Sequence, residues 1–211
     1  MDFPDPRTAD ADGLIAIGGD LSRPTLLAAY RRGIFPWFEA GGPILWWSPD
    51  PRMVLFPDEF HCSRRLARRI RQGRFRISEN EDFMAVVEAC AARPEGTWIT
   101  PGMKRAYGDL FAAGYAHSIE VWEGRCLAGG LYGVRLGRGY FAESMFHRRT
   151  DASKMALFHL CKLARERGWL FIDCQFYTPH LASLGAREIP RDDFLDLMER
   201  AMPPEGTIPR P

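Results

Sequence analysis

Apolar and polar positions along the chain fall into short alternating runs and longer segments with a helical period. Residues 117–122, 126–134 and 139–146 alternate in character and follow one another closely, which predicts an antiparallel meander of three strands. Residues 153–167 carry apolar side chains at helical spacing, and the apolar run 170–175 predicts a buried strand after that helix. Shorter helices are predicted at residues 24–32, 63–71, 82–92, 101–110 and 191–201.

The order of these elements indicates a fold class. Helices, a meander, a helix, a strand and a final helix resemble the fold of the GCN5-related N-acetyltransferases, in which two neighbouring strands splay apart around the acyl donor. We therefore expect an α+β protein with a small N-terminal α/β domain at residues 1–61. A larger acyltransferase-like domain with a mixed, mainly antiparallel sheet is expected at residues 62–211. Residues 147–153 would hold the pyrophosphate of coenzyme A in that fold, but they contain no glycine, so we expect a different donor.

Composition and charge exclude several classes of protein. Of the 211 residues, 46% are hydrophobic and 26% are charged, and the net charge of +1 gives no overall preference for nucleic acid or membrane. The apolar runs are shorter than a membrane span and the first residues lack the features of a signal peptide, so we expect a cytoplasmic protein. The five cysteines and five histidines form neither a CxxC pair nor a metal-binding spacing, so we expect reduced thiols and no metal.

Two of the predicted strands each carry one acidic residue among apolar neighbours. Asp173 and Gln175 stand two positions apart in the segment 170–175, a spacing that puts both side chains on one face of a strand. Glu143 lies among aromatic residues in the segment 139–146. A single carboxylate in an apolar run is more often structural. Two such strands with a helix between them are instead typical of the two walls of one catalytic site.

Aromatic residues and prolines are concentrated between residues 34 and 52. Three of the six tryptophans lie there, at positions 37, 46 and 47, and four prolines stiffen the same stretch. For most of these rings we expect packing in a small core. Aromatic rings beside prolines also suit the stacking of an unpaired base, which keeps a nucleic-acid function open.

Seven arginines lie between residues 61 and 76. Arg64, Arg68 and Arg71 share one face of the predicted helix. Arg65 and Arg69 lie beside that face, and no acidic residue stands three or four positions away to compensate the charge. A solvated charged face is the ordinary interpretation. In a nearly neutral protein, an arginine face is also a candidate for contacts with phosphate groups.

Long sequence blocks closely resemble the bacterial leucyl/phenylalanyl-tRNA–protein transferases. From Gly13 to about Met198 they read GLIAIGGDLS, YRRGIFPWF, ILWWSPDPR, GTWIT, AHSIEVW, GGLYGV, ESMF, ASKMAL, IDCQ and SLGAREIPR. The resemblance implies an aminoacyltransferase that moves leucine or phenylalanine, with methionine as a further candidate, from aminoacyl-tRNA to an acceptor. The acceptors would be proteins that begin with Arg or Lys, and the product would carry an N-terminal signal for degradation.

The resemblance also implies a binding site for the donor. Trp37 and Trp98 would flank the 3′-terminal adenosine, and the arginine-rich helix would bind the body of the tRNA. The pocket for the donated side chain would be lined by Leu131, Tyr140, Leu157 and Ile172. The family pattern has Met and Phe at the positions of Leu131 and Tyr140, so the preference between leucine and phenylalanine stays open.

Catalysis would fall to Asp173, Gln175 and Glu143 by the same resemblance. The carbonyl of Gln175, oriented and polarised by Asp173, would hold the attacking amine, and orientation of two bound substrates supplies much of the rate. Glu143 would lie at the pocket floor or aid the cationic side of the acceptor. A second route would pass the proton through the 2′-hydroxyl of the donor ribose. The donor ester is already activated, so no cofactor, ATP or metal is expected.

Two other functions remain open from the residues alone. The first is an N-acetyltransferase that uses acetyl-coenzyme A, which the glycine-free segment 147–153 disfavours. The second is a tRNA-binding protein without catalytic activity, which the presence of Asp173, Gln175 and Glu143 disfavours. We expect aminoacyl-tRNA and acceptor proteins as partners, no membrane, and a monomeric chain.

Overall fold

The N-terminal part of the chain forms a small unit around a sheet of its own. The computed structural model describes residues 1–10, 12–94 and 96–202. Within these ranges the unit contains η1 (Pro6–Thr8), β1 (Leu14–Ile17), α1 (Arg23–Arg31), β2 (Phe35–Pro36) and β3 (Leu45–Trp47). Its strands pair antiparallel in the order β1-β3-β2. These strands were not predicted from the sequence because each has only two to four residues, too few to show a period.

A larger sheet forms the main body of the described chain. Its strands are β4 (Arg52–Leu55), β5 (Arg76–Glu79), β6 (Ala116–Glu123), β7 (Cys126–Leu136), β8 (Gly139–His147), β9 (Phe171–Gln175) and β10 (Arg187–Ile189). They lie in the order β10-β4-β9-β8-β7-β6-β5. Every neighbouring pair is antiparallel except β8 and β9, which are parallel. The α+β class, the meander and the internal position of the strand after the long helix are therefore confirmed.

The sequence-based domain boundary at residue 61 separates β4 from the sheet to which it belongs. β4 pairs with β9 on one side and with β10 on the other. We propose a boundary near residue 50 instead, between β3 and β4, because it keeps every strand of the large sheet in one domain.

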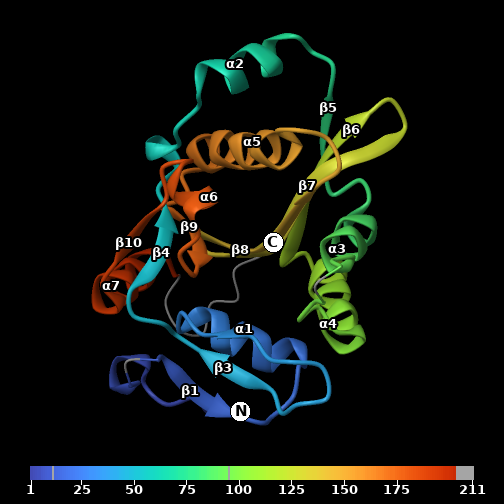
Figure 1. The fold of residues 1–211 in the computed structure, drawn as a ribbon. Helices are drawn as coiled ribbons and strands as arrows, with labels where there is room; N and C mark the ends of the chain where they lie inside the picture. The colour runs from blue at the N-terminus through green and yellow to red at the C-terminus, as the bar shows by residue number, and fades with distance from the viewer. Residues whose placement is uncertain (11, 95, 203–211) are drawn as a thin grey trace.

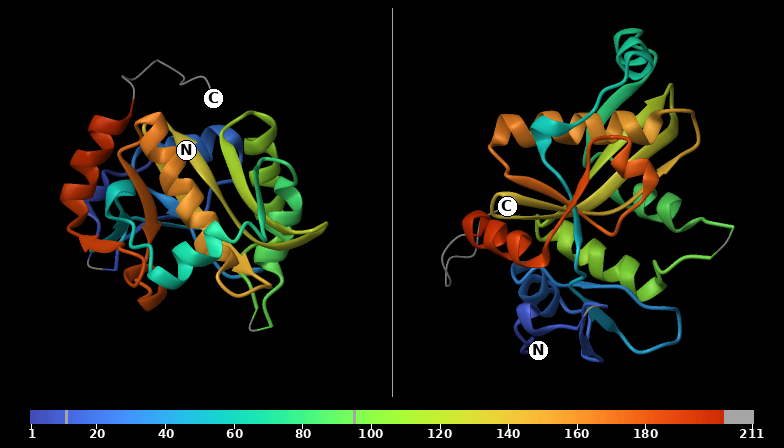
Figure 2. Two further views of the ribbon diagram at one scale, coloured as in Figure 1. Left: turned by 90° about the horizontal axis from the view of Figure 1, so that it is seen from above. Right: turned by 60° about the vertical axis from the view of Figure 1, so that its left-hand side comes forward.

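Helices cover both faces of the large sheet. They are η2 (Pro57–Glu59), α2 (Arg64–Arg71), α3 (Phe83–Ala91), α4 (Pro101–Ala112), α5 (Ala152–Arg167), α6 (Pro179–Ala182) and α7 (Arg191–Ala201). Tyr140 and Ile172 face one hydrophobic core, which includes α5, while their neighbours Phe141 and Phe171 face a second core, which includes α1, α3, α4 and α7. α5 lies across one face with α2 beyond it, and α1 and the small sheet lie at the opposite end of the molecule (Figures 1 and 2).

Short polar signals set the ends of the helices that flank the site. The side chains of Ser63, Asp82 and Thr100 each accept a hydrogen bond from a backbone N–H in the first turn of α2, α3 and α4. Gly168 ends α5 in the left-handed conformation, with φ of 68°. The chain then turns directly into β9, so α5 connects the parallel strands β8 and β9.

Candidate active site

β8 and β9 separate after a short stretch of parallel pairing. They form three residue pairs, the last of which joins Phe141 to Asp173. β9 then continues along β4, where Gln175 lies opposite Met53. A cavity of about 550 Å³ is lined by the diverging ends of the two strands, together with residues of β2, β7 and α5. The splay expected from the sequence is thus present in the structure.

Six of the nine residues expected at the catalytic and aminoacyl sites line this cavity: Trp37, Trp98, Leu131, Glu143, Leu157 and Gln175. They come from positions as far apart in the sequence as 37 and 175, so the fold brings the two acid-bearing strands and the tryptophans to one place. The other three, which are Asp173, Tyr140 and Ile172, are buried behind the cavity wall.

Tyr140 and Ile172 support the cavity wall without reaching its surface, contrary to the expectation that they line it. Their exposed fractions are 1% and 0%. Both belong to the same hydrophobic core as the lining residues Leu131 and Leu157. The Tyr140 hydroxyl donates a hydrogen bond to the carbonyl of His117 at 3.0 Å, which turns it away from the cavity. The resemblance to the family located both residues near the cavity, but their side chains lie beneath its lining.

Asp173 forms a buried ion pair with Arg52. The Arg52 Nε and Nη2 atoms donate to the two carboxylate oxygens at 2.8 and 2.7 Å, and both side chains are 0% exposed. The guanidinium lies over the rings of Phe35 and Phe194, with centroid distances of 4.7 and 4.5 Å. Two aligned charge-assisted hydrogen bonds fix the carboxylate firmly. Asp173 is therefore the link between β9 and β4 and does not face the cavity.

Gln175 leaves the strand alternation at the cavity edge. Its φ of 58° is left-handed, which is uncommon for a residue other than glycine. The Gln175 N–H donates to Oδ1 of Asp173 at 3.0 Å, and this bond holds the turn in place. Its side-chain Nε2 donates to Glu143 at 3.4 Å. Asp173 thus acts on the Gln175 backbone and Glu143 on its amide, whereas the sequence analysis expected Asp173 to orient the amide.

Glu143 is half-buried among hydroxyl donors. Tyr30 donates to Oε1 at 2.8 Å, Tyr107 donates to Oε2 at 2.5 Å, and the two phenol oxygens lie 2.9 Å apart. Burial raises the pKa of Glu143 to about 7, although the hydrogen bonds from Tyr107 and Tyr30 act in the opposite direction. Burial also raises the pKa of both phenols well above its usual value, so they remain donors. Near neutral pH, Glu143 is therefore a group that exchanges a proton.

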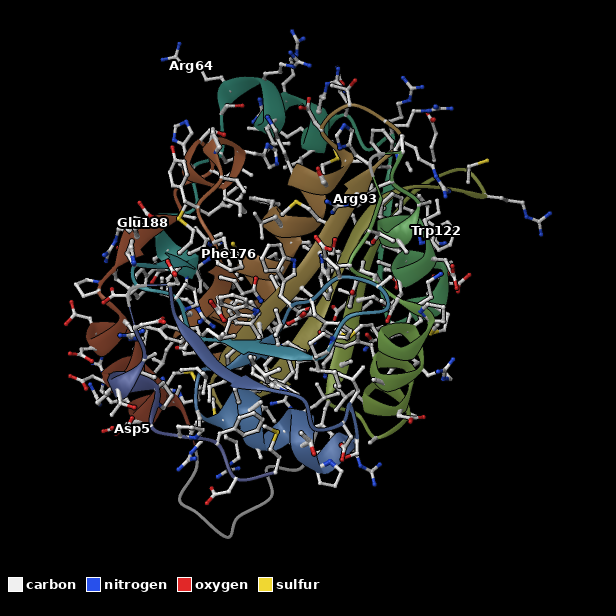
Figure 3. All side chains as sticks on the ribbon, turned by 60° about the horizontal axis from the view of Figure 1, so that its bottom comes forward. Asp5, Arg64, Arg93, Trp122, Phe176 and Glu188 are labelled. Atoms are coloured by element: carbon white, nitrogen blue, oxygen red, sulfur yellow. The ribbon has the colours of Figure 1, made fainter. Side chains whose placement is uncertain are left out.

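The tryptophans divide between core and cavity. Trp46 is fully buried and packs edge-on against Phe3, as expected for most of these rings. Trp37 is 45% exposed, and its ring centroid lies 5.4 Å from that of Phe176. Trp98 reaches the same cavity from the loop before α4. Phe176 and Arg93 also line the cavity and lie near the middle of the view in Figure 3, whereas Trp122, toward the side of that view, does not line it.

The arginines of α2 fall into two groups. Arg65 and Arg69 lie 3.4 and 3.1 Å from Asp151, directly before α5, so a distant acid supplies the compensation that the local sequence lacks. Arg64, Arg68 and Arg71 form no ion pair with any described residue. Arg64 projects from the edge of the molecule in Figure 3. Arg65 and Arg69 therefore anchor α2 to the start of α5. The charges of Arg64, Arg68 and Arg71 stay available to a ligand.

Several site residues were missed from the sequence. Arg52 follows a proline and begins a strand, and the argument used for Asp173 applies to it too, since a charge in a buried strand needs a partner. Tyr30 and Tyr107 lie on separate helices, and only the tertiary fold brings them to Glu143. Arg93, which lines the cavity beside Ser144, gave no local signal.

Neither a cluster of metal ligands nor a membrane-spanning helix occurs among the described residues. Nowhere in residues 1–10, 12–94 and 96–202 do three or more potential His, Cys, Asp or Glu ligands gather around a point that would suit a metal ion. The helices of these ranges are all too short or too polar to cross a bilayer.

Comparison with known proteins decides the family. Residues 54–199 match the model of the leucyl/phenylalanyl-tRNA protein transferase family, and residues 19–50 match the model of its N-terminal domain. The chain belongs to the leucyl/phenylalanyl-tRNA–protein transferase family. The N-terminal match ends at residue 50, between β3 and β4 and at the domain boundary proposed above, and the other match begins within β4 at residue 54.

Relatives in this family cover nearly the whole chain. A leucyl/phenylalanyl-tRNA–protein transferase of Pseudomonas aeruginosa is 52% identical over 215 residues, which span 99% of this chain and 95% of the relative. One from Desulfatibacillum aliphaticivorans is 53% identical over 204 residues, with 95% and 88% covered. Among solved structures, an aminoglycoside acetyltransferase from a soil metagenome matches with a TM-score of 0.41 and 13% identity, over 64% of this chain and 93% of that one.

The buried ion pair generates a prediction about stability. Asp173→Ala and Arg52→Ala should each lower the free energy of unfolding by about 3–5 kcal/mol, because each leaves one buried charge without its partner. The double variant Arg52→Met/Asp173→Leu should recover much of that loss. Urea unfolding followed by circular dichroism measures both. Asp192→Asn, which removes an exposed partner of Arg7, is the matched control and should cost less than about 1 kcal/mol. Losses as small for Asp173→Ala would contradict the assigned role.

Glu143 generates a prediction about pH. Its pKa is raised to about 7 in the folded protein, so the folded state holds a proton that the unfolded state releases at lower pH. The contribution of Glu143 to the free energy of unfolding is greatest at low pH and is lost as the pH rises from about 4.5 to about 7. Glu143→Gln should remove this loss, so the free energy of unfolding of the wild type minus that of the variant should fall by about 3 kcal/mol across the window. A constant difference between pH 4.5 and 7.5 would show that Glu143 titrates normally.

Proposed function

We propose that this chain transfers leucine or phenylalanine from aminoacyl-tRNA to the α-amino group of proteins that begin with Arg or Lys. One observation carries the proposal most directly. The cavity at the splayed strands combines an apolar wall, two tryptophans and a polar pair, Glu143 and Gln175, in a chain of this family. Such a product exposes a leucine or phenylalanine at its N-terminus, which marks the protein for degradation.

The cavity accommodates both parts of the donor. Trp37 and Trp98 offer aromatic faces for the 3′-terminal adenosine, since every base stacks on an aromatic ring. Leu131 and Leu157 lie deeper, on the core that Tyr140 and Ile172 complete from behind. This arrangement supports an apolar pocket of fixed size for the donated side chain. Methionine is close to leucine in size and polarity and is a further candidate.

The reaction forms one bond and breaks another. The acceptor nitrogen attacks the ester carbonyl carbon, the bond from that carbon to the 3′-oxygen breaks, and the proton lost by nitrogen ends on the 3′-oxygen. Gln175 donates its Nε2 to Glu143, which leaves its carbonyl oxygen to accept a hydrogen bond from the amine. Asp173 is the positioning residue that fixes the Gln175 turn through the backbone. Orientation of this kind supplies much of the rate.

Glu143 is the group best suited to hold the proton in transit. Its pKa of about 7 lies close to that of an α-amino group, so transfer between the two needs little driving force. The 2′-hydroxyl of the donor ribose is the alternative carrier to the 3′-oxygen. In either route, the carboxylate form of Glu143 also attracts the cationic first residue of the acceptor.

The arginines of α2 extend the donor site toward the tRNA body. Arg64, Arg68 and Arg71 lie on the far side of α5 and form no ion pair with an acid of the described residues. Arg68 also borders a cavity of about 340 Å³ with Arg74 and Arg149, which both pair with Glu123. A concentration of arginine on one surface of a nearly neutral protein suits the phosphate backbone. We further propose that the chain acts as a monomer and that it works in the cytoplasm, where aminoacyl-tRNA is found.

A transfer assay tests the proposed function. Leucyl-tRNA and phenylalanyl-tRNA should label a peptide that begins with Arg or Lys, and a peptide that begins with Ala should stay unlabelled. Trp37→Leu should raise the free energy of the transition state by about 1–3 kcal/mol and so lower kcat/KM, because stacking contributes that much per base. Trp122→Leu is the matched control, since Trp122 lies on β6 away from the cavity. Equal activity of the two variants would return Trp37 to a packing role, and no labelling by the wild type would reject the function.

The two groups of α2 arginines should behave differently. Arg64→Gln, Arg68→Gln and Arg71→Gln should each reduce the slope of log affinity for tRNA against log salt by about one, because each removes one phosphate contact. Arg65→Gln and Arg69→Gln should leave most of the slope and instead weaken the contact of α2 with Asp151. Filter binding across a salt series measures this. A donor that ends at the 3′-adenosine should react equally with all five variants, and its selective loss in the first three would show that they serve the active site itself.

A further inference from the structure

A second cavity adjoins the reaction cavity. It has a volume of about 720 Å³ and shares three lining residues with the first, Trp37, Arg93 and Trp98. The remainder of its wall comes mainly from the loop before β3, from β3 itself and from the loop before Trp98. The shared residues border both cavities, and this boundary is called the passage below. A ligand too long for the first cavity would extend past it into the second.

Arg93 stands at this passage and is held there by neutral groups. Its Nε donates to the carbonyl of Cys90 at 3.2 Å and its Nη2 donates to the Ser144 hydroxyl at 3.0 Å. Within the described part of the chain no carboxylate pairs with it. It follows the last turn of α3, where a helix end favours a cation. Two hydrogen bonds to neutral groups hold the guanidinium in position and leave its charge for a ligand.

The wall of the second cavity suits a base. Leu45 and Trp47 of β3 give it an apolar side, and the Trp47 Nε1 donates to the carbonyl of Trp37 at 2.7 Å, which fixes the indole. Glu39 is an exposed acid on the same wall. A carboxylate accepts a hydrogen bond from the amino group of cytosine, and aromatic faces stack on any base. The cavity therefore offers recognition for a nucleotide rather than for an anion alone.

We propose that the second cavity binds the cytidine that precedes the terminal adenosine of the donor, and that Arg93 contacts the phosphate that joins the two nucleosides. The proposal rests on the function proposed above, because it takes the adenosine to lie between Trp37 and Trp98. A phosphodiester between two adjacent nucleosides must then pass through the shared passage, where Arg93 supplies the matching charge. Phosphate contacts fix the register of a nucleic acid, so Arg93 sets how deeply the aminoacyl ester enters the first cavity.

The acceptor protein is the other molecule that must leave the reaction cavity. Its first residue carries a cation, which Arg93 repels at the entrance to the second cavity. A negatively charged linker gains from the same side chain. The electrostatics of the passage therefore favour the donor over the acceptor as the occupant of the second cavity.

Three synthetic donors test the proposal with the full-length protein. They are phenylalanyl-adenosine, phenylalanyl-cytidylyl-adenosine, and the same dinucleotide with an uncharged methylphosphonate link. Wild type should use the natural dinucleotide about tenfold better in kcat/KM than the mononucleoside, the size of one charge-assisted contact, and the methylphosphonate should lose most of that gain. A dinucleotide no better than the mononucleoside overturns the proposal while transfer from the mononucleoside leaves the proposed function intact.

The Arg93→Gln variant, tested with the same three donors, shows whether Arg93 is the group that contacts the phosphate. It should lower the use of the natural dinucleotide about tenfold more than that of the mononucleoside, and should no longer distinguish the natural link from the methylphosphonate. Arg125→Gln, in the exposed turn between β6 and β7, is the matched control and should keep the wild-type ratios. An unchanged dinucleotide advantage in Arg93→Gln overturns the proposal. So does a loss that depends on the length of the acceptor peptide, which assigns the second cavity to the acceptor.

Discussion

The ion pair between Arg52 and Asp173 is the interaction on which the site depends. It joins β4 to β9 inside the large sheet, and Asp173 at the same time holds the backbone turn that presents Gln175. Phe35, which belongs to the small N-terminal sheet, packs on the Arg52 guanidinium. Through these contacts, the sheet that carries Trp37 and the strand that carries Gln175 are held against one buried charge. The position of the tryptophan relative to the amide is thus fixed in the core, away from solvent.

Burial and different partners give the two acidic residues, Asp173 and Glu143, different roles. Asp173 has a cationic partner on both oxygens and organises the structure around it. Glu143 has only neutral hydrogen-bond partners, so burial disfavours its charged form and raises its pKa. Two acids on adjacent strands thereby acquire different chemistry from their neighbours alone. Gln175, which contacts both, brings that chemistry to the cavity surface.

Helices and strands long enough to show a period were predictable from the sequence, and contacts between distant segments were not. The meander, α5 and β9 follow from periodicity, and the resemblance to the family located Gln175, Glu143 and Trp37 at one cavity. The partners that give these residues their properties lie 121 positions from Asp173, and 113 and 36 positions from Glu143. Local pattern carries no information on such pairings. The expectation for Tyr140 came from the family resemblance, which places a residue near the pocket but does not fix how deep its side chain lies.

The three oxygen groups around Glu143 set a simple count of hydrogens. Tyr30, Tyr107 and the carboxyl group make three mutual contacts, but when the carboxyl is ionised they possess two hydrogens between them. A third hydrogen, arriving on the carboxyl, allows each group to donate once and accept once, and the ring closes. No heavy atom has to move for this, because hydroxyl hydrogens rotate freely. The cluster can therefore take up one proton. When it does, two strong hydrogen bonds to a carboxylate are replaced by a closed ring of three hydrogen bonds between neutral groups.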